Sequence, residues 1–379
     1  MMKYLRLLLF IIGAAVTVDG AVTVQNLNRT LGIGIFAEKN PWDFQLFLRR
    51  SRLRFAGNGG KYSTFYRGDI AGVPAKEIHI TTDRSARQIT LISIYFANRG
   101  DDRKAASDIQ DARRIISGKL HTLLGKSRRE SPDFVPVRTK MDLWQCRFAK
   151  IWLEVDKNEF IMLHIQPSAV RQPKDAPAKK DLSKNLERNG FGDVYIKNIP
   201  MVDQGSKGYC VPATLSRIFL YYGINMDMHH LAKMGGADPE DGTNVDQINK
   251  SIRFIRRKTG LGMAKISDVS VKSVSRYIDK GVPLCWCMHS TAELNKLYNF
   301  SRLNRPRAGS VQNWKRTLKK ISIPRRTTNN HVCLIIGYNA GTDEIAVSNS
   351  WGNAHIQPLW IPVKAAKKVS ADFLFVFQP

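Results

Sequence analysis

Residues 200–214 read PMVDQGSKGYCVPAT, and this stretch sets the fold prediction for the second half of the chain. Polar residues and glycines lead directly into an apolar segment with helical spacing, which Gly223 ends. The spacing predicts a buried helix that begins at Cys210. Backbone N–H groups and the positive end of the helix dipole favour a thiolate there, so Cys210 is a candidate reactive thiol. The apolar side chains with this spacing are Leu215, Ile218, Phe219 and Tyr222.

A thiol nucleophile needs a general base, and His331 has the most suitable context among the histidines. It follows a polar loop at residues 327–330 and begins an apolar run, VCLIIGY, at residues 332–338. A histidine at the mouth of a strand is held rigidly, and we expect this one to be open to solvent. A purely structural histidine at a strand end is the competing interpretation of the same pattern.

The base needs a group that orients its ring, and Asn349 is suitably placed for this. A turn at residues 341–343 leads into a second strand from residue 344, which would pair with the His331 strand and end at Asn349. An amide there can accept a hydrogen bond from one imidazole nitrogen and turn the other toward the thiol. Trp351 is placed to cover that bond from water.

The order and spacing of these motifs resemble those of the papain-like cysteine peptidases. Gln204 lies six residues before Cys210, His331 precedes an apolar strand, and Asn349 begins the sequence Asn-Ser-Trp-Gly. Two further stretches look more like the bacteriocin-processing leader peptidases, a branch of the same fold. These are CVPA at residues 210–213 and DKGVP at residues 279–283, and the whole resemblance covers about residues 195–379.

The resemblance implies a role for each of four residues. Cys210 would be the nucleophile, His331 the general base and acid, and Asn349 the orienting residue. Gln204 would donate a side-chain N–H to the oxyanion, together with the backbone N–H of Cys210. The implied activity is hydrolysis of peptide bonds in a protein or peptide substrate through an acyl-thioenzyme. The resemblance implies no metal and no organic cofactor.

Two departures from the family pattern bear on the substrate pocket. Lys207 stands where papain has a structural cysteine, so that disulfide is absent, and Val211 replaces the expected Trp or Gly next to the nucleophile. Neither change removes a catalytic atom. The chain also lacks the G-x-x-x-x-G-K-[ST] signature, so a leader peptidase fused to an ATP-driven transporter is excluded.

Composition divides the chain into four segments. Residues 1–20 indicate a secretory signal, because two basic residues precede a short apolar run, and they predict export to the periplasm or beyond the cell. An uncleaved membrane anchor is the competing interpretation, but the run is shorter than the roughly 20 residues that span a bilayer. Residues 21–165 form a first unit, residues 166–190 a linker rich in Pro and Lys, and residues 191–379 the peptidase-like unit. No later segment is apolar enough to span a membrane, so we expect a soluble mature chain.

The predicted fold class is α+β. A C-terminal papain-like fold, in which the helix that carries Cys210 packs on an antiparallel sheet, follows a smaller α+β domain. In that first unit we expect helices at residues 42–48 and 101–124, and strands at residues 77–82, 88–97, 143–155 and 160–166. No catalytic constellation is evident there, and its histidines are expected to be ordinary surface or partly buried residues. They are His79, His121 and His164.

The five cysteines do not form a disulfide framework or a zinc motif. Their number is odd, and no C-x-x-C pair occurs. We expect Cys285, Cys287 and Cys333 to be small buried residues of strands, with a bridge from Cys333 to the neighbouring strand as the lesser alternative.

The chain carries 59 Lys and Arg against 32 Asp and Glu, a net charge of +27. Such a charge attracts anionic partners such as nucleic acid or an envelope polymer, but no nucleic-acid-binding motif with interleaved aromatic residues is present. Residues 302–326 contain nine basic side chains and no acidic ones. This basic stretch is either a solvated loop or a rim of the cleft that selects anionic substrates.

Three other functions remain open at this stage. The same fold could hydrolyse amide bonds of peptidoglycan, or it could pass the acyl group to an amine. A non-catalytic envelope-binding protein that retains the fold is the alternative outside the enzymes, and the reactivity of Cys210 discriminates it from both.

Overall fold

The computed structural model describes residues 22–58, 60–83, 85–99, 105–135, 139–156, 159–169, 181–238, 242–325, 330–352, 355 and 357–379. The predicted secretory signal at residues 1–20 and most of the predicted linker therefore lie outside the described residues. Helices and antiparallel sheets are mixed, which confirms the α+β class. Within the described ranges, no helix is both long and apolar enough to cross a membrane.

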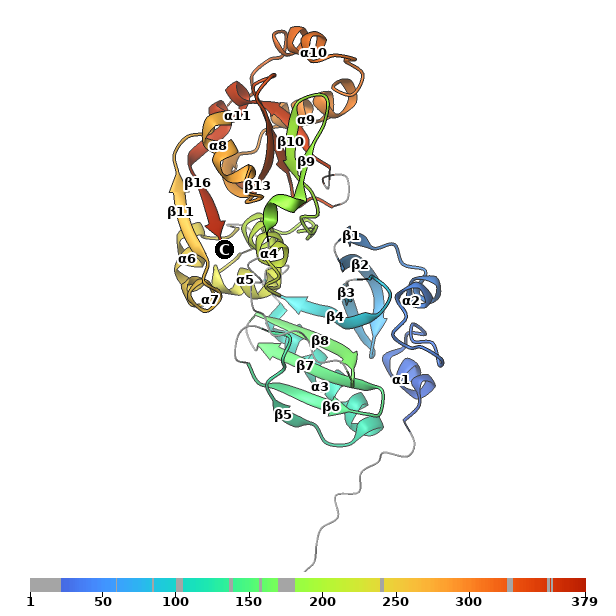
Figure 1. The fold of residues 1–379 in the computed structure, drawn as a ribbon. Coiled ribbons are helices and arrows are strands. Elements are labelled where there is room, and N and C mark those ends of the chain that lie inside the picture. Colours follow the sequence, from blue (N-terminus) through green and yellow to red (C-terminus); the bar gives the residue numbers. More distant parts are fainter. Residues whose placement is uncertain are drawn as a thin grey trace, which may run out of the picture.

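An antiparallel sheet with strand order β1-β2-β3-β4-β8-β7-β6-β5 occupies the first part of the chain and is called the first sheet (Figure 1). Helices α1 (Val24–Leu31) and α2 (Phe44–Ser51) precede it. Its strands are β1 (Ala56–Asn58), β2 (Lys61–Ile70), β3 (Val73–Thr82), β4 (Ile89–Asn98), β5 (Arg128–Glu130), β6 (Met141–Gln145), β7 (Ala149–Asp156) and β8 (Phe160–Pro167).

Helix α3 (Ala105–Leu124) packs on one face of the first sheet, and its buried side chains, Ile109, Ala112, Ile116 and Leu120, lie along one side of the helix. Side chains alternate between the two faces along a strand, so every second strand residue points to the face away from α3. That second face carries buried polar side chains, including Glu77, Ser93, Glu154 and His164. The register aligns them across neighbouring strands, with Ser93 opposite His164.

The first unit differs from the prediction in a strand boundary and in elements that were not predicted. Residues 143–155 were expected to form one strand, but they contain parts of β6 and β7, which pair as a hairpin. The turn between them has no Gly or Pro, so the sequence carries no strong turn signal there. Strand β2 and helix α1 were not predicted at all.

The second sheet has the order β11-β16-β12-β13-β10-β9, and β14 and β15 continue from β13 on its other edge. The long strand β13 pairs through its first half with β12 and through its second half with β10, and it also pairs with β14. Its strands are β9 (Leu186–Arg188), β10 (Asp193–Ile196), β11 (Gly262–Ile266), β12 (Leu284–His289), β13 (Asn330–Asn339), β14 (Glu344–Ser348), β15 (Leu359–Pro362) and β16 (Ser370–Gln378).

Helix α4 (Cys210–Tyr221) lies at the junction of the two sheets (Figure 1). All of its residues except Cys210 and Leu220 are buried, and it contacts α5 and β13. The other elements of this region are the 3-10 turn η1 (Leu182–Asn185) and helices α5 (Met228–Met234), α6 (Val245–Ser251), α7 (Arg253–Thr259), α8 (Val271–Ile278), α9 (Ala292–Asn304), α10 (Val311–Leu318) and α11 (Val363–Val369).

The cysteines of the second sheet are buried and unpaired. Cys285 and Cys287 lie in β12, Cys333 lies opposite Trp286 in β13, and each remains a free thiol. The expectation that they are small buried core residues is confirmed, and the alternative bridge from Cys333 does not form.

Candidate active site

Cys210 is the first residue of α4, as the spacing of the apolar residues predicted. No side chain caps this helix end, so backbone N–H groups of the first turn remain available near the thiol. The thiol is partly buried, and backbone N–H groups of Val332, Val211 and Cys210 lie near enough to the sulfur to lower its pKa. The contact with Val332 places the sulfur beside the start of β13, the strand on which His331 lies.

His331 and Asn349 form the predicted hydrogen bond. Nε2 of His331 lies 3.0 Å from Oδ1 of Asn349, and the two residues come from the facing ends of β13 and β14. The Trp351 ring stacks on the imidazole, with 4.6 Å between centroids, and so covers this bond. Nδ1, the other ring nitrogen, has no hydrogen-bond partner among the described residues. The arrangement leaves Nδ1 as the atom that can accept a proton from a thiol.

The surroundings of His331 correct one expectation. The imidazole was expected to be open to solvent, but only 6% of the residue is exposed, because Trp351 and the sheet enclose it. Burial lowers the pKa of His331 to about 4, against a smaller opposing effect of the Asn349 hydrogen bond. At neutral pH the ring is therefore uncharged, which is the form that a general base requires.

The environment of Cys210 also differs from the expectation. The helix start was expected to favour the thiolate, but burial raises the pKa of the Cys210 thiol, and the backbone N–H groups only partly oppose this. No hydrogen bond joins the thiol to the His331 ring among the described contacts. At neutral pH the thiol and the imidazole are thus both uncharged.

Gln204 lies in the loop before α4, and both ends of its amide are held. Its Nε2 donates to the carbonyl of Lys207 at 3.0 Å, and its Oε1 accepts from the Ser350 hydroxyl at 2.6 Å. A backbone bond from the Gln204 N–H to the Ser350 carbonyl joins the loop to the end of β14. One N–H of the amide group remains for a ligand, since an NH₂ carries two donors.

Two residues of α4 that the sequence analysis did not single out connect the helix to the His and Asn strands. The Thr214 hydroxyl donates to the carbonyl of Val332, next to His331. The buried guanidinium of Arg217 donates to the carbonyls of Pro200, Ser348 and Asn349. Positions 210, 214 and 217 share one face of a helix, so a charged residue on this otherwise apolar face was the available signal.

Of the three histidines of the first unit, His121 is exposed and His79 is partly buried, as expected, whereas His164 is buried. His79 bonds to Glu77 within β3, and His164 bonds to Ser93 and to Glu154. From the other side, Asp227, His229 and His230 meet these groups, with 2.9 Å between His230 Nε2 and Glu154. Strand register aligns His79, Ser93 and His164, and α5 with its N-cap residue Asp227 supplies the other groups. Spacing along the chain gives no hint of this arrangement.

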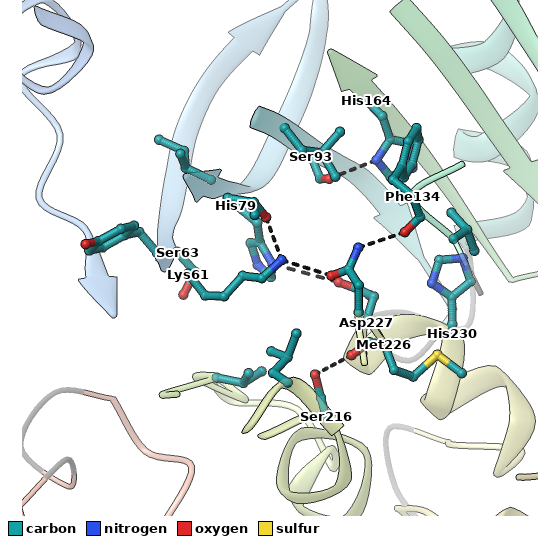
Figure 2. A pocket seen from close by; sticks show the side chains of 18 of the residues that line it. Lys61, Ser63, His79, Ser93, Phe134, His164, Ser216, Met226, Asp227 and His230 are labelled. Carbon is teal, nitrogen blue, oxygen red and sulfur yellow. Dashed lines mark hydrogen bonds and ion pairs between the residues drawn. The ribbon is translucent and has the colours of Figure 1, made fainter. Parts of the chain in front are cut away.

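A cavity of about 80 Å³ lies in this junction between the first sheet and helices α4 and α5 (Figure 2). Figure 2 shows His79, Ser93 and His164 on one side, and Asp227, Met226 and His230 on the other. Neither Cys210 nor His331 is among its described lining residues. Within the described ranges, no group of three or more His, Cys, Asp or Glu side chains is arranged to hold a metal ion.

The basic stretch departs from the expectation at Arg305. Its guanidinium is buried and forms ion pairs with Asp193 and, at 3.1 Å, with Glu344. The seven other basic residues of the stretch that are described are exposed. The basic residues of α10 lie at the end of the domain away from α4 (Figure 1). Trp314 of α10 bonds to Glu344, and Glu344 pairs with Asn339. Asn339 ends β13, whereas His331 lies near its start. Arg326 lies outside the described residues.

The comparison with protein families agrees with the motif order and the fold. Residues 196–369 match the model of the Peptidase_C39 like family. This match places the C-terminal part of the chain in the papain-like cysteine peptidase superfamily, as a C39-like peptidase domain. No curated protein matches the chain.

Two solved structures have low similarity to this chain. A protein of Bacillus anthracis described as a C39-like peptidase has 11% identity and a TM-score of 0.32, over 49% of this chain and 98% of that one. Xylellain, a cysteine protease from Xylella fastidiosa, has 15% identity and a TM-score of 0.26, over 55% of this chain and 92% of that one. The assignment to the superfamily therefore rests on the family match.

Proposed function

We propose that the protein is a cysteine peptidase that hydrolyses peptide bonds through an acyl-thioenzyme on Cys210. The hydrogen bond between His331 Nε2 and Asn349 Oδ1 is the observation that carries the proposal. It fixes the imidazole so that Nδ1 is left for the thiol, whose sulfur lies beside the next residue of β13, Val332. A purely structural histidine would need neither the orienting amide nor a thiol at the adjacent helix start.

The reaction proceeds in two halves. In the first, the Cys210 thiol gives its proton to Nδ1 of His331, the sulfur attacks the peptide carbonyl, and the carbonyl electron pair moves to oxygen. The free N–H of Gln204 and the backbone N–H of Cys210 stabilise this oxyanion. When the carbonyl reforms, the C–N bond breaks, and the proton on His331 passes to the leaving amine.

In the second half, water replaces the amine. His331 accepts a proton from water, the resulting hydroxide attacks the thioester carbon, and the C–S bond breaks. The proton returns to the sulfur of Cys210, so the enzyme regains its initial state and the acyl part leaves as a carboxylic acid. An amine in place of water would give acyl transfer, and the chemistry at Cys210 would be the same.

Cleavage of a proteome-derived peptide library by the wild type and by Cys210→Ala tests the proposal. We expect cleavage products with the wild type and with Cys146→Ala, which removes a thiol remote from the site, and none with Cys210→Ala. Equal cleavage by wild type and Cys210→Ala would overturn the assignment. A thiol at position 210 that labels with iodoacetamide no faster than Cys333 would favour the non-catalytic alternative.

Export is a separate proposal, and it rests on residues 1–20 of the sequence. We expect the protein recovered from the periplasm or the medium to begin at Ala21. Recovery of the full-length chain from the cytoplasm alone would contradict export and would leave the peptidase proposal untouched.

A further inference from the structure

The loop that carries Gln204 toward Cys210 is held by side chains of the first sheet. The Lys207 ammonium pairs with the Glu77 carboxylate of β3, and the Tyr209 hydroxyl donates to Asn98 of β4 at 2.6 Å. At Gly205, where φ is +64°, an added Cβ would lie 2.6 Å from the Phe65 ring of β2. Three strands of the first sheet thus contact one short loop of the peptidase domain.

The ion pair between Glu77 and Lys207 is largely buried. The Glu77 side chain is 3% exposed and the Lys207 side chain 8%. His79 lies 3.0 Å from the second carboxylate oxygen, and His229 lies 3.6 Å from the first. A buried ammonium is costly without its carboxylate, so the pair holds Lys207 in one place. Burial lowers the pKa of Lys207 to about 7, because the charged form is costly away from water.

The position of Lys207 determines the orientation of the Gln204 amide. The Lys207 carbonyl accepts one N–H of Gln204, and the Ser350 hydroxyl fixes the amide oxygen from the other side. These two bonds fix the direction in which the second N–H of the Gln204 amide points. A shift of the Lys207 backbone would therefore turn the donor away from its place, and donor alignment matters steeply in hydrogen bonding.

We propose that Glu77 is a positioning residue for the oxyanion site: through Lys207 it orients the Gln204 amide, so that the first sheet completes the active site of the peptidase domain. This inference rests on the proposed function, because it assigns Gln204 its role in catalysis. It assigns residues 21–165 a task that the sequence alone did not indicate. The first sheet would then be part of the catalytic unit.

Steady-state kinetics of Glu77→Gln, with peptides taken from the cleavage profile, tests the proposal. The substitution keeps the shape of the side chain and removes the charge that holds Lys207. We expect kcat to fall about 10- to 100-fold with KM nearly unchanged, because misplacing a group by a fraction of an ångström affects the transition state most. Glu154→Gln is the matched control. Glu154 is similarly buried in the same face and pairs with His230 of α5, and among the described residues no contact joins it to the loop.

A double-mutant cycle separates positioning from general destabilisation. If Glu77 acts through Gln204, then Glu77→Gln should have little further effect on kcat in a Gln204→Ala background. Additive losses, an unchanged kcat in Glu77→Gln, or an equal loss in Glu154→Gln would each overturn the proposal.

Hydrogen exchange of the loop gives a readout that does not need activity. We expect amides of residues 203–209 to exchange faster in Glu77→Gln than in the wild type, and at the wild-type rate in Glu154→Gln. Unchanged exchange in Glu77→Gln would refute the proposed constraint. A wild-type protein that cleaves no peptide would contradict the proposed function, and the exchange experiment would still decide whether Glu77 holds the loop.

Discussion

Nε2 of His331 lies 3.0 Å from Oδ1 of Asn349, beneath the Trp351 ring. The two residues are 18 positions apart in the sequence and meet because β13 and β14 pair antiparallel. The strand pairing thus fixes the ring orientation, and the nucleophile comes from a third element, α4.

Removal of the Asn349 amide should free the imidazole to rotate. We expect Asn349→Ala to lower kcat by about 10²-fold, in the range of a lost general-base contribution. Asn349→Asp keeps an acceptor oxygen at the same place and should retain more activity than Asn349→Ala. Steady-state kinetics on one peptide substrate measures both, and equal activities of the two variants would argue against the orienting role.

The reactivity of the Cys210 thiol should rise with pH well beyond neutrality. Burial raises its pKa above the ordinary value of 9.0, and burial lowers the pKa of His331 to about 4, so the pair is uncharged at pH 7. Only the thiolate reacts with iodoacetamide, so the labelling rate should increase through pH 9. A rate that stays constant between about pH 5 and 8 would instead indicate a preformed thiolate–imidazolium pair.

Arg217 should matter for both stability and catalysis. Its buried guanidinium is hydrogen-bonded to three carbonyls, which Arg217→Met would leave without partners. We expect the free energy of unfolding to fall by roughly 2–4 kcal/mol, measured by urea denaturation, and kcat to fall as well. Arg316→Met, at an exposed position of α10, should leave both within error. A fully stable Arg217→Met would contradict this account of the helix contacts.

The basic residue that precedes β13 can be tested against one at the end of α10. We propose that Arg325, which is exposed and precedes β13, attracts anionic substrates or an envelope polymer to the cleft. Arg325→Gln should then weaken kcat/KM for acidic peptides more at low salt than at high salt, because salt screens exposed charges. Lys319→Gln, at the end of α10, should have little effect. Equal losses at both salt concentrations would exclude charge attraction.

The sequence predicted the local elements of the site because each has a local signal. Cys210 follows a glycine-rich stretch before a helical stripe, His331 precedes an apolar strand, and Asn349 follows a hairpin. Arg217 was recognisable in principle as the charged residue on an apolar helix face. The sequence placed Trp351 over the bond between His331 and Asn349, but it did not show how far the sheet also encloses the imidazole.

The junction with the first sheet could not be predicted from the sequence. Glu77 and Lys207 are 130 positions apart and carry no shared motif. They meet because β3 places Glu77 on the face that packs against the loop before α4. His79 and His164 are likewise aligned by strand register, and His230 reaches them from α5. The sequence does not specify the register of strands that carry polar side chains on a buried face.

The central claim is that Cys210 forms the acyl-enzyme, and a trapped intermediate tests it most directly. Wild-type protein mixed with a peptide p-nitrophenyl ester, quenched in acid and digested, would be mapped by mass spectrometry. We predict that the peptide acyl group is found on the peptide that contains Cys210, and that Cys210→Ala carries no adduct. Ester turnover with the acyl group on another residue, or with none on Cys210, would contradict the account.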